Sequence, residues 1–318
     1  ILGPIVGGWL TESVNWRRVF YVNLPVGAIT LALMWALLPA TGRKDRKFDL
    51  FGFSMLALGL ASLQLMLDRG AQQDWFDSAE IWIELGIAVA ALWMFVVHLF
   101  TGRETLFNRH MLADRNLVTA MGFMLVIGVV MFASMALLPP MLQNLFGWPV
   151  IDTGWVLAVR GIGILMSMWV AGQLLGKVDA RWMVGTGLAI AALSLWQMSH
   201  WSLEMGMRPV IVSGLVQGIG MGLVFIPLNT MAFATIPPQY RTDGSSLLNL
   251  LRSIGASVGI SVVTTLLGAN IQRSHEDLVS HVTNSSTSML DASTADRFGI
   301  VGDTAMAMVN AEVNRQAA

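Results

Sequence analysis

The sequence contains no cysteine and little charge. Only 12% of its 318 residues are charged, whereas soluble domains carry about 25%. The absence of cysteine excludes disulfide bonds, thiolate metal sites and cysteine nucleophiles. The motifs HExxH, GxSxG and the P-loop are also absent, and the five histidines are scattered, which argues against a hydrolase or an ATP-driven pump. We therefore expect no enzymatic activity, no cofactor and no nucleic acid as partner.

Apolar residues dominate instead, at 55% of the chain with a mean hydropathy of +0.63. About 20 apolar residues in a helix cross the hydrocarbon of a bilayer. The apolar runs are continuous rather than alternating, which favours helices over a β-barrel. We predict an all-α polytopic membrane protein, with a partial helix at 1–10 and eight complete spans at 19–38, 50–67, 81–100, 117–138, 153–176, 182–199, 209–236 and 245–271.

Basic residues are unequally divided between the two sets of loops that alternating spans define. The loops at 41–49, 101–116, 177–181 and 237–244 contain ten Lys and Arg residues, and those on the opposite side contain five. The positive-inside rule places the more basic set in the cytoplasm. The polar, Ser/Thr-rich tail from 272 to 318 is then predicted to be extracytoplasmic.

The opening stretch, ILGPIVGGWL, is an apolar run with an unusual amount of glycine and proline. Gly3 and Gly7 are four residues apart and share one helix face, with Gly8 beside them, so a second helix can approach closely. Pro4 has no N–H and is expected to bend the helix. The same spacing recurs at Gly172 and Gly176, at Gly214, Gly218 and Gly222, and at Gly255 and Gly259. These stripes favour helices that slide or rock against one another.

Two arginines are predicted to lie within the membrane. Arg160 and Arg252 are each the eighth residue of a predicted span, which places them about 10–12 Å from the membrane face. A buried arginine costs roughly 2.5–3.5 kcal/mol on insertion scales, so it should face a cavity, a partner or a polar edge. Two explanations stay open: a charge in a cavity or gate, and a side chain that snorkels to the headgroups. No Asp or Glu is predicted at mid-span.

Neutral polar residues are further candidates for the lining of a cavity. Each is equally suited to a hydrogen bond between helices, worth under about 1 kcal/mol. The candidates are Gln143, Asn144, Gln217, Asn229 and Asn249.

Several stretches together resemble one known family. GPIVGGWL and NWRRVFYVNLPVG (15–27) resemble the antiporter motif of helix five and the entry to helix six in drug/proton antiporters of the major facilitator superfamily. RGIGILMSMWVAGQLLGKVDARWMVGTG (160–187) resembles helix ten and the next cytoplasmic loop of the fourteen-helix branch, the EmrB and QacA type. QGIGMGLVFIPLN (217–229) and YRTDGSSLLNLLRSIGASVGIS (240–261) resemble helices twelve and thirteen.

The resemblance implies a partial major facilitator fold, a fragment without the first four helices, most of the fifth and the last. Residues 1–38 would end the N-terminal half, with the remnant of helix five and helix six. Residues 39–116 would form a cytoplasmic loop and two inserted linker helices. Residues 117–271 would form helices nine to thirteen of the C-terminal half, and 272–318 the polar tail. Such a fragment is not expected to transport by itself.

The resemblance further implies proton-driven export of hydrophobic or cationic compounds by alternating access. The location would be a bacterial inner membrane, with membrane lipid around the protein. A periplasmic adaptor protein and an outer-membrane channel are candidate partners. The proton-carrying residue would lie in the absent helices, and the proton gradient would supply the energy.

Particular residues receive roles by the same resemblance. The opening motif would shape a helix bend and seal the interface between the halves, at Gly3, Pro4, Gly7 and Gly8. The loop after the tenth helix would act in the cytoplasmic gate, through Gly176, Asp179 and Arg181. Two alternatives stay open: an exporter of the same fold for a specific metabolite, peptide or siderophore, and a membrane sensor or scaffold that transports nothing.

Overall fold

The computed structural model describes residues 2–37, 48–102, 105–202 and 204–281. Its ten α-helices are α1 (Leu2–Ser13), α2 (Arg18–Tyr21), α3 (Asn23–Leu37), α4 (Leu50–Arg69), α5 (Ala79–Thr101), α6 (Arg115–Pro140), α7 (Val150–Leu174), α8 (Ala180–Met198), α9 (Met207–Phe233) and α10 (Arg241–His281). Short 3₁₀ segments η1 (Gly70–Gln72), η2 (Trp75–Asp77), η3 (Arg109–Ala113) and η5 (Pro238–Tyr240), and a π-helical turn η4 (Met141–Leu145), lie between them.

The predicted all-α polytopic architecture is confirmed. Each complete span predicted from the sequence corresponds to a described helix, the first of them to α2 and α3 together. Within the described ranges, seven helical stretches are long and apolar enough to cross a membrane. The remaining predicted span is α8, which has 19 residues and is less apolar because Arg181 and Gln197 lie within it.

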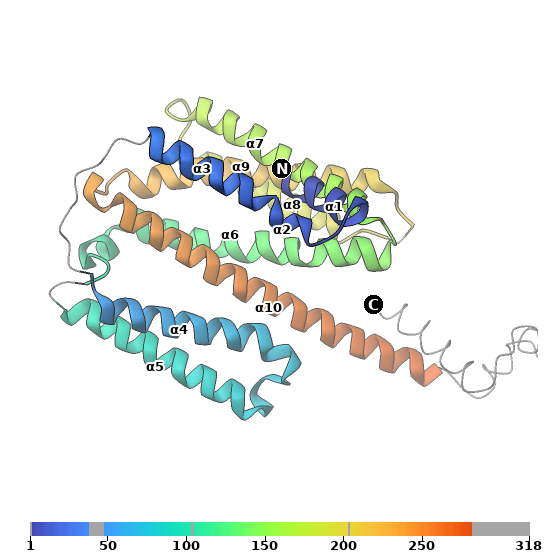
Figure 1. The fold of residues 1–318 in the computed structure, drawn as a ribbon, viewed down its shortest axis with the longest axis horizontal. Helices are drawn as coiled ribbons and strands as arrows, with labels where there is room; N and C mark the ends of the chain where they lie inside the picture. Colours follow the sequence, from blue (N-terminus) through green and yellow to red (C-terminus); the bar gives the residue numbers. More distant parts are fainter. Residues whose placement is uncertain (1, 38–47, 103–104, 203, 282–318) are drawn as a thin grey trace, which may run out of the picture.

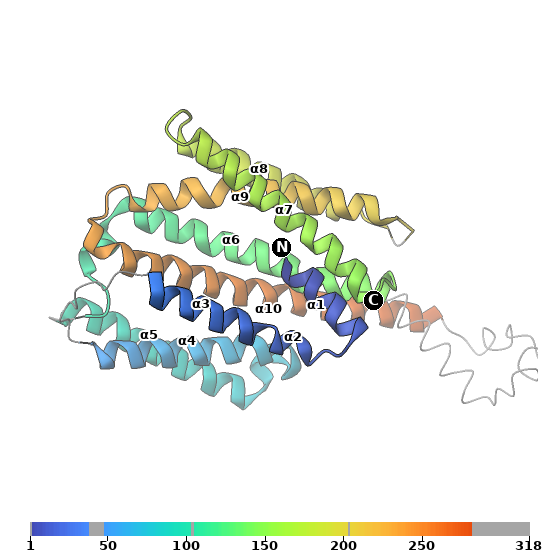
Figure 2. The same ribbon diagram turned by 45° about the horizontal axis from the view of Figure 1, so that its top comes forward.

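The helices are arranged in layers, which Figures 1 and 2 show from two directions. α9 contacts both α7 and α8, and α6 contacts both α9 and α10. The α4–α5 hairpin lies on the other side of α10, and α1 packs against α7. The largest apolar core includes Leu117 and Ile127 of α6, Val224 of α9 and Leu248 of α10. α6 and α9 therefore occupy the centre of the bundle.

Glycines set how closely these helices approach. A Cβ atom on Gly220 of α9 would lie 2.7 Å from the Gly187 oxygen of α8. On α10, a Cβ atom on Gly259 would lie 2.6 Å from the Val129 oxygen of α6. The predicted stripes at 214–222 and 255–259 thus lie at helix–helix contacts, as expected for close packing in lipid. Gly172 of α7 has open space beside it.

Two helices extend beyond their predicted ends. α10 continues from the predicted end of its span to His281, because hydropathy marks the edge of the membrane and residues such as Gln272, Arg273 and Glu276 still favour a helix. The predicted tail beyond His281 lies outside the described residues. α6 continues through Pro139 and Pro140 into η4. These prolines lack the N–H of a regular α-helical bond, and the turn that follows them is π-helical.

The loops separate into two ends of the bundle, as alternating spans require. The connections that follow α5, α7 and α9 lie at the end where α4 begins, on the left of Figure 1. These are the loops with the larger share of basic residues, although most of the basic loop 41–49 lies outside the described residues. We refer to this end as the basic end.

Candidate functional site

Arg160 lies near the middle of α7. Because α7 begins at Val150, three residues before the predicted span, Arg160 is about 15 Å from the start of the helix rather than 10–12 Å. Only 4% of the residue is exposed. An arginine that snorkels keeps its charged head in water, so this burial favours the cavity explanation.

Arg160 belongs to a polar cluster that joins three helices. Its Nη2 donates to the Met131 oxygen of α6 at 3.4 Å. Ser134 Oγ donates to the same oxygen at 2.9 Å and accepts a hydrogen bond from Gln217 Nε2 of α9 at 3.3 Å. Gln217 is fully buried. We call Arg160, Ser134 and Gln217 the Arg160 cluster.

The hydrogen-bonding capacity of the Arg160 cluster is only partly used. Arg160 Nε and Nη1, and Gln217 Oε1, are buried and have no partner among the described residues. A buried polar group without a partner costs about 1–3 kcal/mol, and a charged group costs more. The cluster is therefore not a fully satisfied polar network, and the role of Arg160 as a cavity or gate charge stays a prediction.

Close packing of α7 on α9 holds this cluster in place. A Cβ atom on Gly163 would lie 2.6 Å from the Leu215 oxygen. Ser167 Oγ donates to the Gly218 oxygen at 3.4 Å. A Cβ atom on Gly218 of α9 would in turn meet the Arg160 oxygen. Glycines on both helices therefore allow the Arg160 backbone to lie against α9, and the side chain extends to α6.

Of the three glycines in the opening motif, Gly8 is the one at which a Cβ atom would meet α7. A Cβ atom on Gly8 would lie 3.0 Å from the Val150 oxygen, whereas Gly3 and Gly7 have no atom within 4 Å of theirs. Pro4 lies in the first turn of α1. One turn beyond Gly8, Glu12 Oε1 accepts a hydrogen bond from the Ile151 amide at 3.1 Å. This carboxylate lies beside the N-terminus of α7, where the helix dipole favours a negative charge. The predicted bend and seal stay predictions.

Arg252 has a different environment from Arg160. It is half-buried in α10 and donates from Nη2 to Asn249 Oδ1 at 3.0 Å. Asn249 lines a cleft of about 380 Å³ between α4 and α10, with Gln64 on the opposite wall. Ser257 of α10 donates to Gln64 Oε1, and Ser261 donates to the Leu67 oxygen of α4 at 2.8 Å. Polar contacts therefore attach the α4–α5 hairpin to α10.

The predicted gate loop forms a tight turn at the basic end. Gly176 has a φ of +86°, which favours glycine. Asp179 is the N-cap of α8 and accepts a hydrogen bond from the Arg181 amide at 2.9 Å. Arg181 and Arg115 line a cleft of about 580 Å³ between α6, α8 and α9. The structure thus gives Asp179 a capping contact, and its role in a gate stays a prediction.

The remaining candidates for a cavity lining lie apart from the Arg160 cluster. Gln143 and Asn144 are in η4, half-buried and exposed respectively. Asn229 donates to the Phe225 oxygen of its own helix at 2.8 Å. Of the five neutral candidates, Gln217 alone is placed with a buried arginine. That these residues line a cavity stays a prediction.

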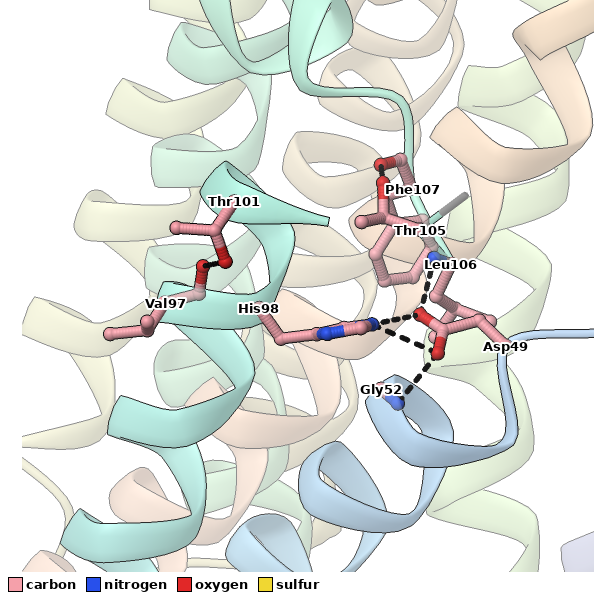
Figure 3. A network of polar contacts seen from close by, with 8 residues as sticks. All are labelled: Asp49, Gly52, Val97, His98, Thr101, Thr105, Leu106 and Phe107. Atoms are coloured by element: carbon pink, nitrogen blue, oxygen red, sulfur yellow. Dashed lines mark hydrogen bonds and ion pairs between the residues drawn. The ribbon is translucent and has the colours of Figure 1, made fainter. Parts of the chain in front are cut away.

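Asp49, which the sequence analysis did not single out, connects three segments at the basic end (Figure 3). Its Oδ1 accepts a hydrogen bond from the Gly52 amide at 2.8 Å, and its Oδ2 accepts one from the Leu106 amide at 2.9 Å. His98 Nε2 of α5 lies 3.0 Å from both oxygens. An Asp directly before an apolar run is an N-cap signal, but the partners on α5 and on the loop after it are visible only in the fold.

These contacts determine the charge state of Asp49. Desolvation raises the pKa of its carboxyl group, but the hydrogen bonds from Gly52, His98 and Leu106 together outweigh it and hold the pKa below the usual 3.8. Asp49 is therefore an ionised link between the start of α4, the end of α5 and the connection to α6.

The family model of the Major Facilitator Superfamily matches residues 1–260. The chain belongs to the Major Facilitator Superfamily. Its members are transporters, so the family agrees with the long apolar helices and makes this a multi-pass membrane protein. The resemblance predicted from the opening motif and from the stretch around Arg160 is confirmed at the level of the superfamily.

Individual relatives extend this result. The chain is 29% identical over 290 residues to the Multidrug export protein EmrB of Haemophilus influenzae, covering 89% of the chain and 56% of the relative. It is 29% identical over 325 residues to the Fatty acid resistance protein FarB of Neisseria gonorrhoeae, covering 99% and 63%. A crystal structure of a bacterial homolog of the human lysosomal transporter Spinster matches with a TM-score of 0.47 at 15% identity, covering 99% of the chain and 69% of that structure.

These figures also give the extent of the match. The chain spans roughly 56–63% of the length of the curated relatives named above. EmrB-type exporters are thus its relatives over most of its own length, and the predicted kinship with them is confirmed.

Proposed function

We propose that the complete protein is a proton-driven exporter of lipophilic small molecules, cationic compounds included, in a bacterial inner membrane. It would work by alternating access, in which two halves rock about a central binding site. The names of the relatives EmrB and FarB, multidrug export and fatty acid resistance, support export of apolar compounds. A periplasmic adaptor protein and an outer-membrane channel are proposed as partners.

The contact between α1 and α7 carries this proposal. By family membership these helices belong to opposite halves of the transporter, and alternating access requires a contact that closes and parts. Gly8 brings α1 within close reach of the first residues of α7, and Glu12 accepts a hydrogen bond from Ile151 there. Both contacts lie at the end of the bundle opposite to the basic end. This position supports a role for them as an outer seal.

Retention of ethidium in an efflux-deficient bacterium tests the proposal. The complete gene is expressed with and without a protonophore, beside Gly8→Leu and the control Gly172→Leu. A Cβ atom at Gly8 already meets the α7 backbone at 3.0 Å, whereas Gly172 has open space. We expect export that the protonophore abolishes, that Gly8→Leu loses and that Gly172→Leu keeps. Immunoblots of the membrane fraction establish equal amounts of protein.

The opposite result is equally clear. If no lipophilic dye is exported in a protonophore-sensitive manner, the proposal is wrong. The same fold would then serve a narrow metabolite or a function without transport.

A further inference from the structure

The cleft of about 580 Å³ between α6, α8 and α9 carries two arginines at the basic end of the bundle, where α6 and α8 begin. Arg115 is the first residue of α6, and Arg181 is the second residue of α8. Both residues are exposed, and neither guanidinium has a hydrogen-bond or ion-pair partner among the described residues. Their donors are therefore free to bind a ligand.

No acidic side chain of the described residues lines this cleft. Two acids directly precede the helices of the cleft or lie close to their first residues, and both act as N-caps. Asp114 accepts a hydrogen bond from the Leu117 amide at 2.9 Å, and Asp179 accepts one from the Arg181 amide at 2.9 Å. The two positive charges in the cleft thus complement an anion.

The deeper part of the cleft is apolar. Phe123 follows Arg115 by eight residues on α6, and Leu188 follows Arg181 by seven residues on α8. At 1.5 Å per residue, these side chains start about 10–12 Å further along the bundle than the arginines. α9 contributes Leu228, which is buried. Charge at one end and an apolar lining of this length favour an amphiphile over a free ion.

The depth of the arginines in the membrane agrees with a lipid headgroup. Trp182, directly after Arg181, is 74% exposed, and exposed tryptophans of membrane proteins concentrate at the level of the headgroups. The positive-inside rule assigns the basic end to the cytoplasm. Basic clefts between membrane helices on that side are suited to the headgroups of anionic lipids.

We propose that this cleft binds an anionic phospholipid of the cytoplasmic leaflet, with its phosphate at Arg115 and Arg181 and an acyl chain along Phe123 and Leu188. The forked donors of arginine match the oxygens of a phosphate. The lipid joins α6 to α8, which both pack on α9. The site is separate from the α1–α7 contact and does not depend on which compound the protein transports.

Native mass spectrometry of the complete transporter in detergent measures bound lipid directly. The protein is titrated with dioleoylphosphatidylglycerol and, separately, with dioleoylphosphatidylcholine, a zwitterionic lipid that has the same chains. Inorganic phosphate is the competitor that has the charge without the tail. We expect phosphatidylglycerol to bind more tightly than phosphatidylcholine, and we expect inorganic phosphate not to displace it.

Single substitutions of the arginines test the headgroup contact. Arg115→Gln and Arg181→Gln should each weaken phosphatidylglycerol binding roughly 5-fold, the loss expected for one basic residue at an anionic lipid surface. Arg208→Gln is the matched control, because Arg208 is exposed at the start of α9, at the opposite end of the bundle. This control should bind the lipid as the wild type does.

A substitution of Gly185 tests the apolar part without a change of charge. Gly185 lines the cleft and has open space beside it. Leucine favours a helix over glycine, so Gly185→Leu should not lower the melting temperature in detergent alone. It fills the cleft, so it should lose phosphatidylglycerol binding and the rise in melting temperature that this lipid produces. Gly172→Leu, at an open position on α7 outside the cleft, should keep both.

Several outcomes would overturn the proposal. Equal binding of the two lipids would show that the arginines do not select the headgroup. Displacement of the lipid by inorganic phosphate would assign the arginines to a free anion. Unchanged phosphatidylglycerol binding in both arginine variants, or in Gly185→Leu, would show that the lipid binds elsewhere, as expected if another helix of the complete protein fills the cleft.

Discussion

Gly163 offers the sharpest test of how α7 and α9 pack. Alanine at this position adds a Cβ atom 2.6 Å from the Leu215 oxygen, 3.2 Å from the Ile219 nitrogen and 3.3 Å from the Gly218 Cα. All three are backbone atoms, so no side-chain rotation relieves the contact. Ordinary contact begins at 3.4 Å, so the helices must separate by about 0.8 Å, the difference between 3.4 and 2.6 Å.

Two opposing effects determine how much Gly163→Ala changes the free energy of unfolding. Overpacking of this kind costs about 1–3 kcal/mol, and a gap of 0.5–1 Å removes a quarter to a half of the dispersion energy across a contact. Alanine also favours a helix interior over glycine by roughly 0.5–1 kcal/mol. Gly172→Ala on the same helix has open space beside it, so it gains the helix propensity of alanine without the cost of overpacking. Gly163→Ala should therefore be about 1–3 kcal/mol less stable than Gly172→Ala.

Unfolding in mixed micelles with increasing SDS measures this difference. The free energies of unfolding of the two alanine variants and the wild type are compared in the complete protein. We expect Gly172→Ala at or slightly above the wild type and Gly163→Ala below both. Equal stability of the two variants would show that α7 and α9 do not pack through Gly163.

Three other substitutions test individual contacts. Asp49→Asn should speed hydrogen exchange at the Leu106 amide, because the amide loses its ionised acceptor. The folded pKa of Asp49 is lowered, so its ionised form stabilises the protein above pH 3.8, and this stabilisation is lost as the pH falls through the folded pKa. The exchange rate of the wild type should therefore match that of the variant only in strong acid. Glu12→Gln should weaken the α1–α7 contact and speed hydrogen exchange at the Ile151 amide, because that amide loses its charged acceptor. Ser261→Ala should cost about 0.6 kcal/mol of unfolding free energy in SDS.

Much of the fold follows from the sequence. Continuous apolar runs predict the spans, because the bilayer requires about 20 such residues. The spacing of Gly214, Gly218 and Gly222 predicts close helix packing, and the structure shows a Cβ atom on Gly222 within 2.5 Å of the Ile164 oxygen. These are local properties of the chain, and the hydrocarbon solvent leaves few alternatives to them.

What the sequence could not supply are contacts between distant segments. Asp49 and Leu106 are 57 residues apart, and nothing in either stretch specifies the other. Gln217 was one of five neutral polar candidates, and only the packing of α6 beside α9 distinguishes it by bringing it to Ser134. The end of α10 was missed because charged residues continue a helix as well as they end an apolar run.

Transport in liposomes against imposed pH gradients tests the central claim most directly. The complete protein is reconstituted, the pH gradient is set in either direction, and the movement of ethidium is followed by fluorescence. A proton-driven exporter should move ethidium against the flow of protons and reverse direction when the gradient is reversed. Movement that is the same for both gradients, or absent in both, would contradict the account.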